Sequence, residues 1–192
     1  MERSKILLVI MIPVLSFMAC KSNAKKEKSA FSDIKTFIED HPGLQKGNNT
    51  YTISTPDGWK RKDTMISGVQ IARIESPLDG PGDTFRENIT IVTEDASHMD
   101  LKEYIAANRK SMETQMPAVK FLTEENITIG VEPAIAMNIS LPYSGYDIRN
   151  TEYFLVKNNI GYVITCTATS TTFNTYQPTF IKCVNTFSIK TD

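Results

Sequence analysis

The feature that most constrains the fold is a series of short alternating runs that are joined too closely for parallel crossovers. Apolar and polar residues alternate over 51–56, 69–74, 88–93, 119–129, 134–141, 151–156 and 162–169. Alternation with a period of two is typical of strands that bury one face. A parallel neighbour needs a crossover of about a dozen residues or more, and most of these runs are separated by fewer. The sequence therefore predicts a mainly antiparallel β-sheet.

Helical spacing interrupts the alternation in three places. The segment 31–40 has one apolar face and ends at a Pro-Gly pair, and 173–184 also gathers its apolar residues on one side. Between them, Asp100 and Glu103 have the spacing of a capping box that opens a helix, which should end before Pro117. A last short strand is expected at 187–189, and a tight hairpin turn at 158–161. The predicted fold class is α+β, a mainly antiparallel sheet flanked by helices.

The first twenty residues form a separate unit. Arg3 and Lys5 precede an apolar stretch over 6–17, which is too short to cross a bilayer comfortably because a span needs roughly 20 residues. The stretch ends at a small residue, Ala19, followed by Cys20, and this order is typical of an export signal with its cleavage site. The alternative is an ordinary secretory signal in which Cys20 has no role.

The segment 17–20, Phe-Met-Ala-Cys, resembles the lipobox of bacterial lipoproteins. Phe17 departs from the usual leucine of that motif, whereas Ala19 matches it. The resemblance implies a signal peptide over 1–19, removed after export, and lipids attached to Cys20. Residues 20–30 would then be a lysine-rich flexible tether, and 31–192 a single globular domain. The tether lysines would either contact anionic headgroups or only keep the linker solvated.

Two further cysteines, Cys166 and Cys183, remain if Cys20 carries lipid. Outside the cytoplasm such a pair is free to form a disulfide. The alternative is two buried reduced thiols that act as small apolar side chains. Their spacing is not that of a thiol redox motif.

Composition and motifs offer little support for catalysis, metal binding or nucleic-acid binding. A formal net charge of -1 gives no electrostatic reason to expect nucleic acid as a partner. The two histidines, His41 and His98, are expected at the surface beside helix ends, and no Gly-x-Ser-x-Gly motif is present. We therefore expect no catalytic residues, no metal ligands and no cofactor.

Three aromatic side chains are candidates for a contact surface. Trp59, the lone tryptophan, follows a Pro-Asp-Gly turn and would either pack on the core edge or mark a partner surface. Tyr143 and Tyr146 flank a Ser-Gly turn that suits adaptable recognition, although both rings could instead lie back on the sheet.

The segment 51–59, an alternating strand that runs into Pro-Asp-Gly-Trp, resembles the opening of PsbP-like superfamily domains. The Asn-Ile-Thr-Ile run at 88–91, the Asp-Leu-x-Glu-Tyr helix start at 100–104 and the Tyr-Val-Ile-Thr run at 162–165 continue the likeness. So do the spaced aromatics at 173–180 and Thr-Phe-Ser at 186–188, so that the resemblance covers roughly residues 50–190. It implies an α/β/α sandwich that binds or assembles with partners, and it assigns no functional residue here.

These observations favour a non-catalytic binding or assembly module, held on a membrane of the bacterial cell envelope by a lipid anchor, on the periplasmic or outer-membrane face. Its expected partners are the membrane itself and a protein of the envelope. One alternative is a carrier or sensor of a small apolar ligand that uses a gap between sheet and helices. A hydrolase built from scattered polar residues is the other.

Overall fold

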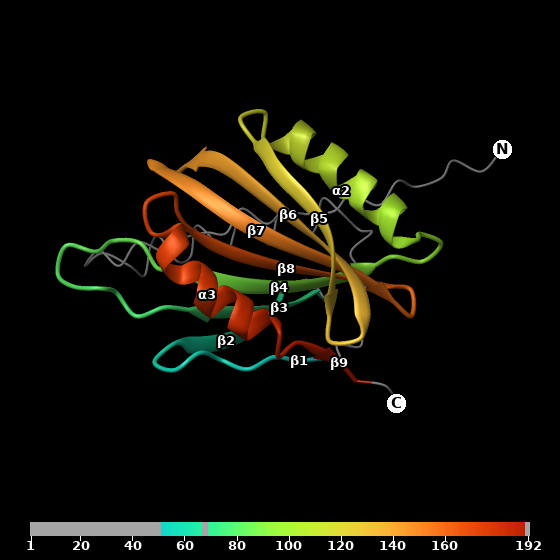
Figure 1. Cartoon of the computed structure of the whole chain (residues 1–192), viewed down its shortest axis with the longest axis horizontal. Coiled ribbons are helices and arrows are strands. Elements are labelled where there is room, and N and C mark those ends of the chain that lie inside the picture. The colour runs from blue at the N-terminus through green and yellow to red at the C-terminus, as the bar shows by residue number, and fades with distance from the viewer. Residues whose placement is uncertain (1–50, 67–68, 191–192) are drawn as a thin grey trace.

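The computed structural model describes residues 51–66 and 69–190 of the chain (Figure 1). In chain order the described elements are β1 (Tyr51–Thr52), β2 (Lys60–Ile66), β3 (Val69–Glu75), β4 (Asn88–Asp95), α2 (Leu101–Gln115), β5 (Lys120–Ile129), β6 (Glu132–Tyr143), β7 (Tyr146–Lys157), β8 (Ile160–Thr169), α3 (Phe173–Val184) and β9 (Ser188–Ile189). The predicted signal peptide, tether and helix over 31–40 lie outside the described residues, as do Cys20 and His41.

The main sheet has seven strands in the order β2-β3-β4-β8-β7-β6-β5, and every neighbouring pair is antiparallel. β1 and β9 form a separate two-stranded antiparallel sheet. The predicted antiparallel α+β architecture is therefore confirmed. Of the described helices, neither is long and apolar enough to cross a membrane.

Two-residue loops close the long hairpins. Asn158 and Asn159 join β7 to β8 with φ angles of 53° and 64°, and Ser144 and Gly145 join β6 to β7 with 50° and 85°. Positive φ at both central residues is the geometry of the hairpin turn that matches strand twist, and asparagine and glycine adopt it most easily. The turn predicted at 158–161 is confirmed.

The start of α2 follows from its sequence. The Asp100 carboxylate accepts a hydrogen bond from the backbone N–H of Glu103 at 2.8 Å, and the Glu103 side chain accepts one from the Asp100 N–H at 3.0 Å. The capping box is thus complete, as predicted. On its buried face α2 presents Tyr104, Ile105, Asn108, Ser111 and Met112.

The two helices cover opposite faces of the sheet. Phe154 of β7 packs in the cluster of α2, whereas the next residue, Leu155, packs in the cluster of α3. Because consecutive strand residues point to opposite faces, the sheet separates two apolar cores. The α3 core also contains Tyr51 of β1 and Phe187, which directly precedes β9, and the centroids of their stacked rings lie 5.3 Å apart. The layers are helix, sheet and helix, as expected of an α/β/α sandwich.

The structure adds one strand that the sequence pattern did not predict. β2 reads Lys-Arg-Lys-Asp-Thr-Met-Ile, and Arg61, Lys62 and Asp63 are exposed. It lies at the edge of the sheet, where polar side chains face water on both sides and no apolar alternation arises. Four strands rather than three therefore precede α2 in the described part of the chain, and β1 is shorter than the run predicted over 51–56.

Candidate functional site

A groove runs between the extended segment 53–59 and the second half of α3. Its volume is about 340 Å³, and it is lined by Ser54, Thr55, Pro56, Asp57, Trp59, Thr179, Lys182, Cys183 and Thr186. We call it the Trp59 groove. One wall is a stretch of backbone without regular secondary structure, and the other is a helix whose inner face belongs to the core.

The backbone of Ser54 fixes the first wall to α3. Its N–H donates to Thr186 Oγ1 at 2.8 Å, and its carbonyl accepts from the Cys183 thiol at 3.0 Å. Thr186 in turn donates to the Cys183 carbonyl at 2.6 Å, which closes the contact onto the last turn of the helix. Both backbone polar groups of Ser54 are therefore used internally, and its side chain is left exposed beside the groove.

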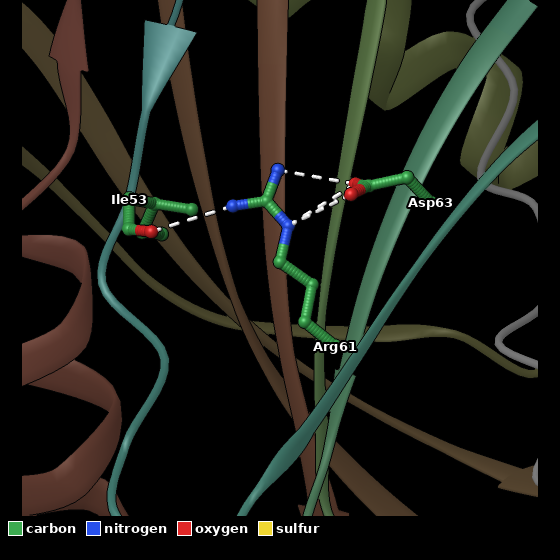
Figure 2. Close-up of polar contacts among 3 residues, drawn as sticks. All are labelled: Ile53, Arg61 and Asp63. Atoms are coloured by element: carbon green, nitrogen blue, oxygen red, sulfur yellow. Dashed lines mark hydrogen bonds and ion pairs between the residues drawn. The ribbon is translucent and has the colours of Figure 1, made fainter.

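Arg61 of β2 holds the same wall from the other side (Figure 2). Its Nη1 donates to the Ile53 carbonyl at 3.4 Å, while Nε and Nη2 each donate to Asp63 Oδ1 at 3.1 Å. Such an exposed ion pair contributes little stability by itself, but the fork aims the guanidinium at the backbone of Ile53. The segment 53–59 is thus tied to both α3 and the edge strand.

Trp59 serves the core and the groove together. Its ring lies 6.0 Å from Tyr176 and 6.1 Å from Phe180, both on α3, in edge-on contacts. Gly58, with a φ of 76°, turns the chain so that the Trp59 N–H donates to the Pro56 carbonyl at 3.1 Å. The ring is half-buried, packs against the core and also lines the groove.

The rim of the groove carries one exposed charge of each sign, Asp57 and Lys182. Hydroxyl groups of serine and threonine lie between them, and the indole supplies an apolar contact. Polar groups spaced around one aromatic ring suit an extended polypeptide, since hydroxyls bond to backbone groups and the ring takes an apolar side chain.

The cysteine at the base of the groove is not set up as a nucleophile. Burial raises the pKa of the Cys183 thiol to about 11, although Arg61 lowers it in part. Burial also raises the pKa of Cys166 well above its usual value. At neutral pH both are thiols, and the thiolate is the reactive form.

The candidate disulfide is not formed in this structure, where Cys166 and Cys183 are both free and buried. The Cys183 thiol is engaged with the Ser54 carbonyl instead. The alternative left open by the sequence, two buried thiols in an apolar core, is the arrangement observed.

The two candidate tyrosines do not line this groove. The Tyr146 hydroxyl bonds to Thr84 Oγ1 at 2.8 Å, and its ring packs edge-on against Phe85 at 5.1 Å. Tyr146 therefore secures the loop over 76–87 rather than standing free. Tyr143 pairs with it across the hairpin and is half-buried.

Sequence reasoning found Trp59 and Cys183 but missed the residues that place them. Arg61, Asp63 and Lys182 are charged residues in exposed segments, where composition alone assigns no role. One signal was present, because opposite charges at positions 61 and 63 lie on the same side of an extended strand. Of the described residues, no group of three or more histidine, cysteine or acidic side chains could hold a metal ion.

A second hollow lies between α3 and the sheet. Its volume is also about 340 Å³, and its floor includes Ile127 of β5, Ala136 of β6, Tyr153 of β7 and Val184 of α3. Polar side chains, among them Glu125 and Gln177, form the rest of its lining. Among the described residues, this hollow is the gap between sheet and helix in which a carrier of a small apolar ligand would hold that ligand.

Comparison with known proteins gives matches at the level of structure. No family model matches the chain, and no curated protein matches it in sequence. The cyanobacterial PsbP (CyanoP) of Synechocystis sp. PCC 6803 is 12% identical, with a TM-score of 0.57 over 76% of this chain and 90% of that one. LpqN of Mycobacterium tuberculosis, described as involved in cell envelope biogenesis, is 13% identical, with a TM-score of 0.58 over 76% and 87%. Protein PA94 of Pseudomonas aeruginosa, of unknown function, is 19% identical, with a TM-score of 0.57 over 74% and 99%.

These likenesses establish the fold. At such identities a shared architecture does not carry an activity, since one fold hosts many functions. The chain therefore has the antiparallel α+β fold of PsbP-like proteins, as its sequence motifs implied.

Proposed function

We propose that this chain is a non-catalytic, lipid-anchored binding module of the bacterial cell envelope, and that the Trp59 groove receives an extended segment of a partner protein. The observation that carries the proposal is the groove itself, whose open wall is held in place by Ser54 and Arg61. A preformed wall lowers the entropic cost of binding an extended peptide.

The predicted anchor fits this role. Lipids on Cys20 would keep the domain within a short tether of the membrane and restrict its partners to proteins at that surface. Asp57 and Lys182 at the rim would orient the bound segment, because each attracts the opposite charge.

The test is site-specific photo-crosslinking in membranes that contain the natively lipidated protein. A crosslinker at exposed Thr55 is expected to capture one envelope protein, and Lys182→Glu should reduce that capture at least about tenfold, since reversing a rim charge replaces attraction by repulsion. Lys102→Glu reverses an exposed charge on α2, on the other face of the sheet, and should leave the capture unchanged.

A capture that is equal in wild type and in Lys182→Glu would contradict the groove as the binding surface. The second hollow supplies the rival function, a carrier of a small apolar ligand, because its floor is apolar. Absence of any crosslinked protein, together with a lipid-like molecule in native mass spectra of the purified protein, would favour that carrier function instead.

A further inference from the structure

Two rows of polar side chains cross the face of the sheet that α2 covers. Strand register places Lys62, Arg73, Thr90, Thr165 and Glu152 in one row, and Lys60, Glu75, Asn88, Thr167 and Asn150 in the next. Phe154 on β7 lies two residues from Glu152, Val163 on β8 lies two residues from Thr165, and both belong to the α2 core. Because residues two apart on a strand point to the same face, the two rows lie on the α2 side of the sheet. We call these two rows of polar side chains the polar rows.

The centre of the polar rows is buried. Glu152 has no exposed surface, and Asn150 and Thr167 are 3% and 2% exposed. Both carboxyl oxygens of Glu152, Oδ1 of Asn150 and Oγ1 of Thr167 have no hydrogen-bond partner. A buried polar atom without a partner costs free energy and calls for an explanation such as a ligand site.

The four unsatisfied oxygens of Glu152, Asn150 and Thr167 share one chemistry. All four oxygens can accept hydrogen bonds once the Glu152 carboxyl is ionised, and Glu152 then also supplies a single negative charge. Burial raises the pKa of Glu152 to about 8, and the neighbouring side-chain amide of Asn150 lowers it in part, so that the carboxyl is mostly protonated at neutral pH.

The neighbouring charges do not neutralise Glu152. Arg73 Nε is paired with Glu75 Oε1 at 2.6 Å, whereas its buried Nη2 has no hydrogen-bond partner, and Lys60 and Lys62 lie on the edge strand β2. On the side of α2, the buried residues of the helix carry no charge, and the hydroxyl of Tyr104 donates to Glu94 at 3.2 Å.

We propose that Glu152, Asn150 and Thr167 form a binding site for one primary ammonium group. An ammonium group offers three N–H donors and one positive charge, which match several free acceptors and one carboxylate. On binding, the Glu152 carboxyl loses its proton to the solvent and the resulting carboxylate pairs with the cation, so that the net charge of the site stays at zero.

The test compares thermal unfolding of the full chain in nonionic detergent with methylammonium chloride and with tetramethylammonium chloride at equal ionic strength. Methylammonium should raise the melting temperature, because a ligand of the native state stabilises it. Tetramethylammonium has the same charge without N–H donors and should not. The binding constant should be about tenfold larger at pH 9 than at pH 7, since the carboxyl no longer has to release a proton.

Glu152→Gln should abolish the stabilisation by methylammonium. Glu87→Gln is the matched control, because Glu87 is also buried but accepts hydrogen bonds from Thr172 and Ser76. If Glu152→Gln does not fold, Thr167→Val removes one acceptor at constant shape and should weaken binding several-fold. No stabilisation of wild type, an equal effect of tetramethylammonium, or an equal effect of potassium chloride would each overturn the ammonium site.

Discussion

At the scale of single residues, Gly161 on β8 lies against the ring of Tyr104 on α2. A Cβ at this position would lie 2.4 Å from Tyr104 Cζ and 2.5 Å from its hydroxyl oxygen. Tyr104 is fully buried, packs on Phe154 at 6.3 Å and donates to Glu94, so its ring has little room to move. Gly161→Ala should therefore lower the free energy of unfolding by about 1–3 kcal/mol, as measured by urea denaturation, because overpacking a core forces strain.

The matched control is Gly82→Ala in the loop over 76–87. A Cβ there meets no atom within 4 Å, and Gly82 is not among the positive-φ glycines. Its free energy of unfolding should stay within about 0.5 kcal/mol of wild type, as for most surface substitutions. Equal stability of Gly161→Ala and wild type would show that α2 can shift away from β8.

Single residues also mark the limit of what the sequence could predict about the site. Trp59 attracted attention because it is the lone tryptophan, and the structure places it both in the core and in the groove. The partners that hold the groove, Arg61 on Ile53 and Thr186 on Ser54, join positions 8 and 132 residues apart. Both contacts end on backbone groups of the irregular segment 53–59, so neither follows a helix or strand period that the sequence would show.

At the scale of elements, α2 depends on its capping box. Asp100→Ala removes the acceptor for the Glu103 N–H and leaves one more helix donor without a partner. The free energy of unfolding should fall by about 1 kcal/mol, within a range of about 0.5–2 kcal/mol, in urea denaturation. Asp100→Asn keeps an oxygen acceptor at the cap and should retain most of the stability. A loss as large in Asp100→Asn as in Asp100→Ala would point to the charge of Asp100 rather than to the cap.

Elements with a buried face were predictable, and those without one were not. β8 and α3 each bury an apolar side, so their period appears in the sequence. β2 lies at the sheet edge with exposed charged residues, and its strand conformation comes from pairing with β3. β1 is reduced to two residues because the chain after it leaves the β1–β9 pair to form the wall of the groove.

At the scale of the whole molecule, the fold and the predicted cellular location depend on different parts of the chain. The described domain shares its architecture with proteins of differing roles, so the architecture alone does not indicate where in the cell the protein acts. The predicted location depends on residues 1–20, where an apolar stretch ends at Cys20. A mutation there should move the protein without changing the domain, which separates the two questions experimentally.

Cys20→Ser should release the protein from the membrane fraction. Each buried methylene of an attached lipid contributes about 0.8 kcal/mol to membrane binding, so several long chains hold the wild type firmly. A serine hydroxyl is not the thiol that the lipid is transferred to, and the variant should appear in the soluble envelope fraction after export.

The control variant, Cys183→Ser, changes a buried cysteine of the domain and should leave the amount of protein in the membrane fraction unchanged. Fractionation followed by intact-mass measurement checks both variants. Wild type with an unmodified Cys20, or equal partitioning of Cys20→Ser, would remove the anchor from the proposed function and leave the groove to be tested as that of an exported, unanchored module.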